Sequence, residues 1–236
     1  MASTIQLERT ILICQQFLRL APLTFPTNPN NDPAFFCADW VKQMILSPPF
    51  AWRWNRTSAT VIAPTFTTVL GNTDYQVNLP NFGWIEKATA YDPNNANSAY
   101  ELQVGLNTAI EPLNNQPARI TAQLDDTEGN ITFRIFPASD AVYSVVVESQ
   151  NAASLFTAST DTWAPIPDYL SYLYISGFQA KVYEYSNDPR YLPAMQLFLQ
   201  QLAAASENLD STQKNLWITD RLNSLRQTQM VQQGRA

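Results

Sequence analysis

The chain has 236 residues, of which 45% are apolar and 14% are charged, so it is long enough to bury a sizeable core and too rich in apolar residues to be disordered as a whole. Twenty acidic and fourteen basic side chains give a net charge of −6, which excludes nucleic-acid binding through a generally basic surface. Histidine is absent and two cysteines are present, which excludes histidine-based catalytic dyads, histidine-bound metals and a fold that depends on disulfides or cysteine-bound zinc.

Two helices are predicted before residue 50. Apolar residues spaced three and four positions apart indicate a first helix over about 5–20, and a loop rich in proline and asparagine follows at 22–32. Asp32 is a suitable N-cap and Pro33 suits the first helical position, so together they predict the start of a second helix. The consecutive prolines at 48–49 end it, because proline cannot continue a helix.

Short runs rich in β-branched and aromatic residues, separated by turn signals, replace the helical pattern between about residues 50 and 155. In the clearest run, Ile131, Phe133 and Ile135 share one face, and we expect this run to pair with the next one across the turn at 137–140. Since no helical period separates consecutive runs, an antiparallel sheet folded as a sandwich or small barrel is predicted. The expected strands are 59–62, 66–70, 75–79, 84–91, 100–105, 131–136 and 142–147.

Helical spacing returns after the prolines at 165 and 167. Leu170, Leu173 and Phe178 fall on one face of a predicted helix that ends near Asn187. Apolar residues over 192–202 predict another helix, and the short connection between the two indicates an antiparallel hairpin.

Residues 210–236 differ from the rest of the chain because they carry four basic and two acidic side chains and many glutamines. As an isolated segment they would form a marginal helix at best, and a frayed tail is one interpretation. Trp217 is costly to leave in water, which favours the other interpretation, an extended arm that becomes ordered on a neighbouring subunit.

The predicted fold class is therefore α+β. A discontinuous helical bundle, made of N-terminal helices and a C-terminal helical hairpin, contains an inserted antiparallel β-sandwich or barrel and is followed by an extended C-terminal arm. The predicted domains are the N-terminal helices 1–49, the β domain 50–164, the helical hairpin 165–209 and the arm 210–236.

The segment 49–56 combines three aromatic residues with two arginines. Such a cluster can be a stacking platform for sugar rings or single-stranded nucleic acid, or it can join two domains, with its tryptophans buried and its arginines bonded to carbonyl groups. We favour the second interpretation, because no basic groove is recognisable near the tryptophans. The domain-junction residues are then Trp52, Arg53, Trp54 and Arg56.

Motifs for chemistry are weak throughout the sequence. Asp125, Asp126 and Glu128 form the densest acidic group, but they lack the spacing of a calcium loop and are expected to be a solvated hairpin tip. No glycine-rich phosphate loop occurs, and no local motif nominates a pair of catalytic carboxylates. We therefore expect no catalytic, metal-binding or cofactor-binding residues, and a protein that is not an enzyme.

Several short motifs occur in the same order as in one known family. They are the aromatic stretch 50–55, Tyr75–Pro80, Trp84–Ala88, Arg134–Pro137, Tyr143–Val147 and Ile166–Asp168. With these motifs, and over about residues 1–210, the chain resembles the head–tail adaptor (connector) proteins of tailed bacteriophages, the group that includes tail tubular protein A of short-tailed phages. The loop at 22–32 departs from the family pattern.

The resemblance implies a structural virion protein at the head–tail neck, made in the host cytoplasm. Such a protein forms a homo-oligomeric ring, usually of twelve copies, between the portal protein and the downstream tail or nozzle protein. Double-stranded DNA passes through the ring without sequence recognition. No membrane contact is expected, since no apolar run is long enough to span one. By the same resemblance, the portal-binding residues lie in the arm and are Lys214, Leu216, Trp217, Arg221, Leu225 and Arg226.

Alternatives from other classes remain open at this point. Trp52, Trp54 and Trp84, with the asparagine-rich loops, are compatible with a carbohydrate-binding β module. A carboxylate-based hydrolase is a second alternative, although no pair of acids is nominated. Another virion component, such as a tail terminator or minor capsid protein, is the third.

Overall fold

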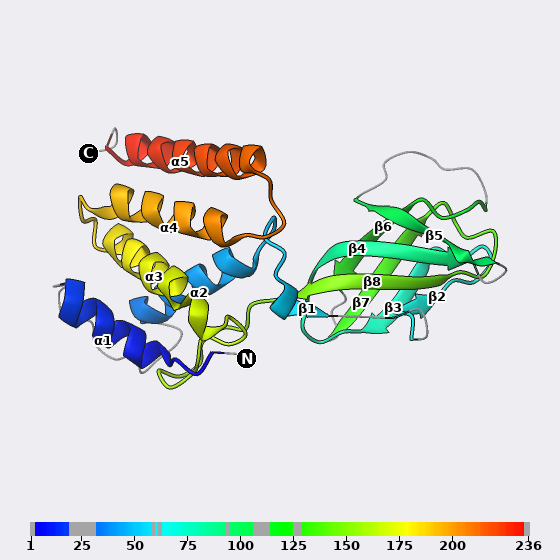
Figure 1. Ribbon diagram of the computed structural model, residues 1–236, viewed down its shortest axis with the longest axis horizontal. Coiled ribbons are helices and arrows are strands. Elements are labelled where there is room, and N and C mark those ends of the chain that lie inside the picture. Colours follow the sequence, from blue (N-terminus) through cyan, green and yellow to red (C-terminus); the bar gives the residue numbers. More distant parts are fainter. Residues whose placement is uncertain are drawn as a thin grey trace. The chain divides into compact units, whose positions relative to one another are not determined.

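The computed structural model describes residues 3–18, 32–57, 60, 63–92, 95–105, 114–124 and 129–233. Within these residues the protein is mixed α+β, with five α-helices and a curled eight-stranded sheet that resembles a half-barrel (Figure 1). The chain divides into a helical unit, Met1–Trp54 with Ala153–Ala236, and a β unit, Asn55–Ala152. Residues 50–54 and 153–164, which we expected in the β domain, therefore belong to the helical unit.

The second helix of the helical unit begins where its capping residues predict. The Asp32 carboxylate accepts a hydrogen bond from the Ala34 N–H at 2.9 Å, and Pro33 is the first helical residue, so the predicted start of the second helix is confirmed. The first helix starts two residues later than expected, because the Ile5 carbonyl accepts a hydrogen bond from the Trp163 N–H in an extended segment before it. The helices are α1 (Leu7–Leu18), α2 (Pro33–Leu46), α3 (Ser171–Tyr185), α4 (Tyr191–Ala205) and α5 (Ser211–Gln233).

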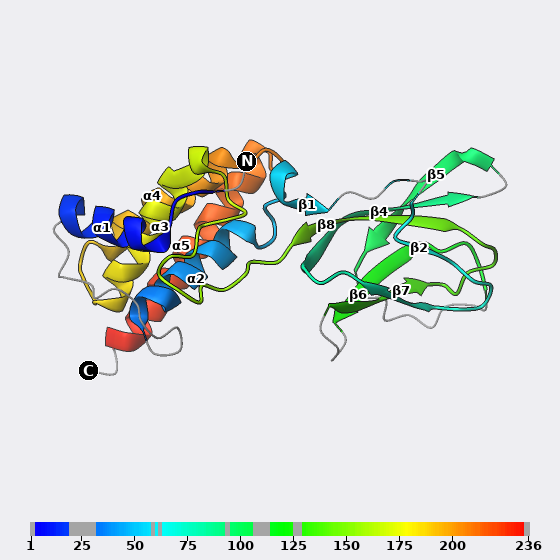
Figure 2. The ribbon, with the colours of Figure 1, turned by 90° about the horizontal axis from the view of Figure 1, so that it is seen from below.

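Three helices approach one another closely at Gly177 of α3. A Cβ at this position would lie 2.8 Å from the Phe198 ring of α4 and 2.8 Å from a Val41 methyl group of α2, so the glycine makes this packing possible. Ser176 donates a hydrogen bond to Gln201 at 2.6 Å and adds a polar contact between α3 and α4. α4 and α5 also lie side by side (Figures 1 and 2).

Residues 210–236 are not an extended arm in the part that the structure describes. They contain α5, which belongs to the helical unit, and the side chain of Trp217 packs against the core of its own chain. The sequence interpretation was wrong here because the surface that α5 packs on, made by α4 and Phe50, could not be foreseen from the segment's own few apolar residues. Those residues are sufficient for packing once a neighbouring helix supplies the other surface.

The β unit contains the curled sheet, whose strand order is β1-β8-β4-β5-β6-β7-β3, with β2 also paired to β8. Its inner face buries a stack of aromatic rings, in which Phe66 lies 4.8 Å from Tyr75 and 5.6 Å from Phe133 between ring centroids. The strands are β1 (Arg56–Thr57), β2 (Phe66–Thr67), β3 (Asp74–Asn78), β4 (Phe82–Asp92), β5 (Asn95–Val104), β6 (Arg119–Leu124), β7 (Asn130–Phe136) and β8 (Ser144–Asn151).

Strand positions are confirmed more often than strand pairings. The runs predicted at 75–79, 84–91, 100–105 and 131–136 all coincide with observed strands, whereas β6 was missed and 66–70 shortens to β2. Most of the strand expected at 59–62 lies outside the described residues.

Two predictions about strand pairing are wrong. β7 pairs with β3 and β6, and β8 pairs with β4, so the expected hairpin across the turn at 137–140 does not form. β5 pairs with β6 in parallel, so the sheet is not the entirely antiparallel one that we expected. Alternation of apolar residues determines which face of a strand is buried, but it does not determine the neighbouring strand.

No helix in the described ranges is long and apolar enough to cross a membrane.

Gly83 gives a test of how closely β4 approaches β8. A Cβ at Gly83 would lie 2.9 Å from the Ala152 nitrogen and 2.9 Å from the Gln150 carbonyl oxygen, and these backbone atoms cannot move aside as a side chain can. We expect Gly83→Ala to lower the free energy of unfolding by about 1–3 kcal/mol, measured from urea-unfolding midpoints. The control is Lys87→Ala on the same strand, where the exposed side chain is 3.9 Å from Glu101 and the change should stay within about 0.5 kcal/mol. Equal effects of the two substitutions would contradict the close approach.

Candidate assembly surface

Trp52 is part of the helical core and does not form an exposed stacking platform. Its side chain is 4% exposed, and its indole N–H donates a hydrogen bond to the Ile45 carbonyl at 2.7 Å. Its ring stacks on Trp54 at 5.4 Å between centroids, and Phe50 is fully buried beside it. Trp54 and Trp84 are half-buried, so none of the three tryptophans that suggested a carbohydrate site offers a freely exposed ring.

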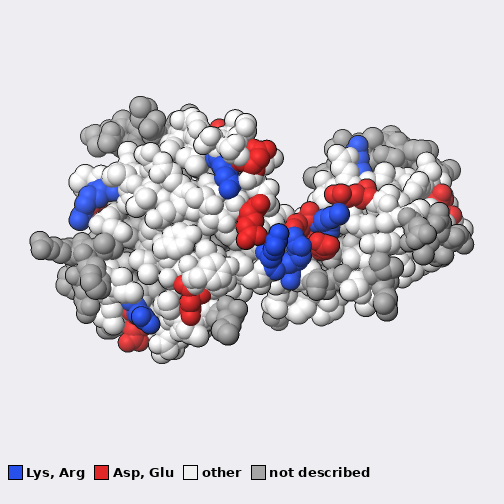
Figure 3. Space-filling model, in the orientation of Figure 1, with Lys and Arg blue, Asp and Glu red and all other residues white. Residues whose placement is uncertain are grey.

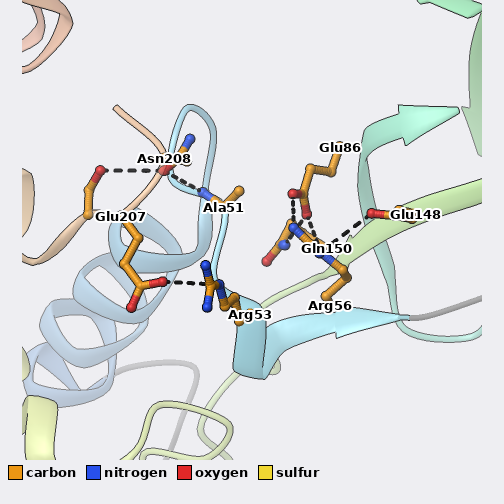
Figure 4. Close-up of polar contacts among 9 residues, drawn as sticks. Ala51, Arg53, Arg56, Glu86, Glu148, Gln150, Glu207 and Asn208 are labelled. Carbon is orange, nitrogen blue, oxygen red and sulfur yellow. Dashed lines mark hydrogen bonds and ion pairs between the residues drawn. The ribbon is translucent and has the colours of Figure 1, made fainter. Parts of the chain in front are cut away.

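The two arginines of this segment bind carboxylates rather than the carbonyl groups that we expected (Figure 4). Arg53 lies 3.3 Å from Glu207 in the helical unit, and both side chains are largely exposed, so this pair contributes little stability. In the β unit, Arg56 binds Glu86 through two nitrogens and lies 3.5 Å from Glu148. The hydrogen bond to Glu86 raises the pKa of Arg56 above its ordinary value.

The boundary between the two units falls between Trp54 and Asn55. Trp52, Arg53 and Trp54 therefore belong to the helical unit, and Arg56 belongs to the β unit. The residues that we expected at a domain junction are thus neighbours of the boundary along the chain.

The C-terminal helix contacts the same aromatic segment. The Trp217 ring meets the edge of Phe50 at 4.8 Å between centroids and an angle of 79°. Between α4 and α5, the Asn208 side chain donates a hydrogen bond to the Pro49 carbonyl at 2.8 Å. It also accepts one from the Ala51 N–H at 3.2 Å (Figure 4). The structure therefore brings together two groups of residues that the sequence analysis treated separately.

The residues proposed for portal binding have different exposures. Lys214 is half-buried and donates a hydrogen bond to the Ser206 carbonyl at 2.8 Å, and Leu225 packs partly against the helical core. Arg221 is exposed, with its guanidinium 5.9 Å from the Trp217 ring centroid. The Arg226 side chain lies outside the described part of the chain.

Leu216 is the most exposed apolar side chain among those candidates. It is 64% exposed and lines a shallow recess of about 300 Å³ on the outer face of α5. The other residues that line this recess are Thr212, Asn215, Thr219 and Asp220.

The helical unit exposes apolar side chains on a surface with few charges. Figure 3 shows that most of the viewed face of this unit carries neither acidic nor basic residues. Exposed apolar side chains with few charges nearby are compatible with a surface that binds another protein. Among the described residues, the large apolar side chains exposed on this unit are Phe36, Leu155, Tyr169, Tyr172, Tyr185, Leu197 and Leu216.

Sequence reasoning missed two charged residues on α2, a buried Lys42 and a partly buried Asp39. The Lys42 side chain is 2% exposed; its ammonium lies 3.0 Å from the Ser154 hydroxyl and 4.7 Å from the centre of the Phe156 ring. Asp39, one turn earlier, accepts a hydrogen bond from the Phe156 N–H at 2.8 Å. Two charged residues three positions apart within an otherwise apolar helix are the signal that could have identified this pair.

Burial dominates the ionisation of these groups. It lowers the pKa of Lys42 to about 8, and the carboxylates of Asp39 and Asp161 oppose that shift only in part. Burial also raises the pKa of Asp39. Cys14 and Cys37 are free, buried thiols, and burial raises the pKa of each to about 12, so both should react slowly with alkylating reagents.

Within the ranges that the structure describes, no group of three or more histidine, cysteine or acidic side chains could hold a metal ion. The acidic residues 125–128 lie outside those ranges.

Neighbouring substitutions on α5 test the packing of this helix. Trp217→Ala removes the ring that contacts Phe50, and we expect it to lower the free energy of unfolding by about 1–3 kcal/mol. Leu216→Ala is the matched control, because this side chain is exposed and its loss should change stability by no more than about 0.5 kcal/mol. Urea unfolding followed by far-UV circular dichroism measures both. If the two variants lost equal stability, the docking of α5 on Phe50 would be contradicted.

Lys42 should make stability depend on pH. Its pKa is about 8 in the folded chain and lies near 10.5 when the side chain is in water, so between these values the unfolded chain binds more protons. The contribution of Lys42 to stability must therefore rise as pH rises through this window. Relative to Lys42→Met, we expect the free energy of unfolding of the unaltered chain to increase by about 2 kcal/mol from about pH 7 to about pH 10. Tyrosines and cysteines titrate in both proteins, so their contributions cancel in the difference between the two free energies of unfolding. If that difference did not change with pH, the burial of the Lys42 ammonium would be contradicted.

No protein-family model matches the chain, and no curated protein is significantly similar to it in sequence. What the chain does is therefore inferred from its motifs and from the surfaces described above.

Proposed function

We propose that the chain is a head–tail adaptor of a tailed bacteriophage, a structural protein that forms a ring between the portal protein and the downstream tail or nozzle protein. The observation that supports this best is the exposed apolar set on the weakly charged helical unit. Such a surface is costly to leave in water and gains free energy when other protein chains cover it. In a ring of copies, usually twelve, most of that surface would be covered.

The packing of the helices supports a more detailed proposal about the architecture. We propose that α3 and α4 act as a helical hairpin that completes a discontinuous bundle with α1 and α2. The close packing at Gly177 and the hydrogen bond between Ser176 and Gln201 support this pairing. The inserted curled sheet would then be the sandwich or barrel module of the adaptor family.

The helical unit and α5 would make the portal contact. Leu216 offers an exposed apolar anchor on the outer face of α5, and Arg221 offers an exposed positive charge one turn and a half further along. Trp217 and Leu225, which we first expected to bind the portal, pack partly against their own chain, so their role would be to hold α5 in place. The β unit would face the downstream tail protein.

Passage of double-stranded DNA suits the charge of the chain. A net charge of −6 repels phosphates weakly, so a ring of these chains would guide DNA without binding it. The protein would be made in the host cytoplasm and reside in the virion neck.

Attachment to capsids that carry a portal but no tail tests this function. We expect the purified chain to cosediment with such particles from its own phage, and cryo-electron microscopy to locate it as a ring on the portal. Leu216→Asp should reduce attachment by at least about tenfold, because a charge replaces a buried anchor in the contact. Gln123→Glu, which adds the same charge at an exposed position of the β unit, is the control and should attach normally.

The possible outcomes separate the parts of the proposal. Failure of the unaltered chain to attach to the particles, or density at the distal end of the tail as for a tail terminator, would refute the adaptor function. Normal attachment of Leu216→Asp would instead refute the role of α5 while leaving the ring in place. Deletion of α5 is a poorer test, because it would also uncover Phe50.

A further inference from the structure

One end of the β unit presents three exposed aliphatic side chains on two neighbouring loops. Val69 and Leu70 lie on the loop 68–73, and Val142 lies on the loop 138–143; they are 59%, 63% and 49% exposed. The loops are adjacent because the Thr68 N–H donates a hydrogen bond to the Tyr143 carbonyl at 2.9 Å. We call these three side chains the apolar tip.

The loops that carry the tip are held by buried hydroxyl groups. The Thr68 hydroxyl oxygen accepts a hydrogen bond from the Tyr143 N–H at 2.7 Å and lies 3.0 Å from the buried Ser139 hydroxyl. The Tyr75 hydroxyl accepts from the Val69 N–H at 3.1 Å and lies 2.9 Å from the Asn72 carbonyl oxygen. Since these loops are ordered before any partner arrives, binding at the tip costs little conformational entropy.

A groove on the helical unit could accept the aliphatic side chains of this tip. It lies between α4 and α5, has a volume of about 420 Å³, and contains Ala203, Ala204 and Ile218 among its lining residues. Small residues leave room for side chains of another molecule. Leu197, half exposed and two turns before Ala204 on α4, extends the apolar surface at one end.

The charges of the two surfaces are also opposite. Within the described residues of the two tip loops, Asp140 is the one charged side chain, and it is exposed. Among the residues that line the groove, Lys214 is the one charged side chain. Amide and hydroxyl groups of Gln200, Asn215 and Thr219 form the rest of the groove's polar rim.

We propose that the groove binds the apolar tip of a second copy of this chain, with Asp140 of that copy near Lys214. The two surfaces are different patches of the same chain, so the contact is heterologous; repeated from copy to copy it builds a ring where the rotation closes and an open filament where it does not. The inference rests on the ring proposed above and specifies which surfaces form it. Three aliphatic side chains are too few for a stable interface, so they would be the apolar centre of a contact whose larger area is polar.

Single cysteines introduced on the two surfaces test the contact. Leu70→Cys and Ala204→Cys are both at exposed positions, and the variants are mixed, with an affinity tag on one of them, and treated with a short bis-maleimide crosslinker. The native thiols of Cys14 and Cys37 are buried and should not interfere. We expect a crosslinked dimer that contains one tagged and one untagged chain. The matched control replaces Leu70→Cys by Val104→Cys, an exposed aliphatic position of β5 outside the tip loops, and should give several-fold less crosslinked product.

Sedimentation of the uncrosslinked chain provides the second measurement. Leu70→Asp should weaken self-association by roughly tenfold or more, whereas Val104→Asp should change it by less than about twofold. Self-association without crosslinking above the control, or crosslinking of Leu70→Cys mainly to itself, would overturn the tip-in-groove contact and leave a ring built on other surfaces. A chain that stays monomeric at every concentration and gives no crosslink would also overturn the contact. The attachment of the chain to portal-bearing particles would then still decide the proposed function independently.

Discussion

Burial of Trp163 is the interaction on which the helical unit depends. Its ring is fully buried, stacks on Tyr174 of α3 at 4.6 Å between centroids, and donates its N–H to the hydroxyl of Thr10 on α1 at 2.9 Å. Trp163 lies on the segment that follows the β unit, whereas Thr10 lies before it. The helical core therefore closes only when the two separated parts of the chain meet, and the β unit is an insertion between them.

The apolar residues of the helical unit fall into two groups, those buried in this core and those exposed at the surface. Trp52 and Trp163 lie in the core, and the indole N–H of each donates a hydrogen bond within it. The exposed tyrosines and leucines lie at the surface of the helical unit, whose viewed face carries few charges (Figure 3). Under the proposed function, other chains of the ring and the portal would cover part of this second group.

Sequence reasoning succeeded where the signal was local. Asp32 followed by Pro33 specifies a helix start within a few residues, and the alternation of Ile131, Phe133 and Ile135 specifies a strand and its buried face. It failed where the answer depended on distant residues. The partner of β8 is set by the curl of the whole sheet, and the docking of α5 depends on Phe50, which precedes it by more than 160 positions. The candidate site shows the same division: the aromatic segment and the C-terminal residues were recognised, but not that they pack together.

The geometry of α5 explains how one helix can contribute to two contacts. The recess around Leu216 and the groove floored by Ile218 lie on different flanks of α5, and both are lined by Asn215 and Thr219. A partner on one flank would therefore share those two residues with a partner on the other. Trp217 lies on neither flank; its ring packs on Phe50 and holds α5 against the helical core. If the portal occupies the first flank and a second copy the second, both partners contact the ridge of Asn215 and Thr219, so a substitution at either residue would affect both contacts.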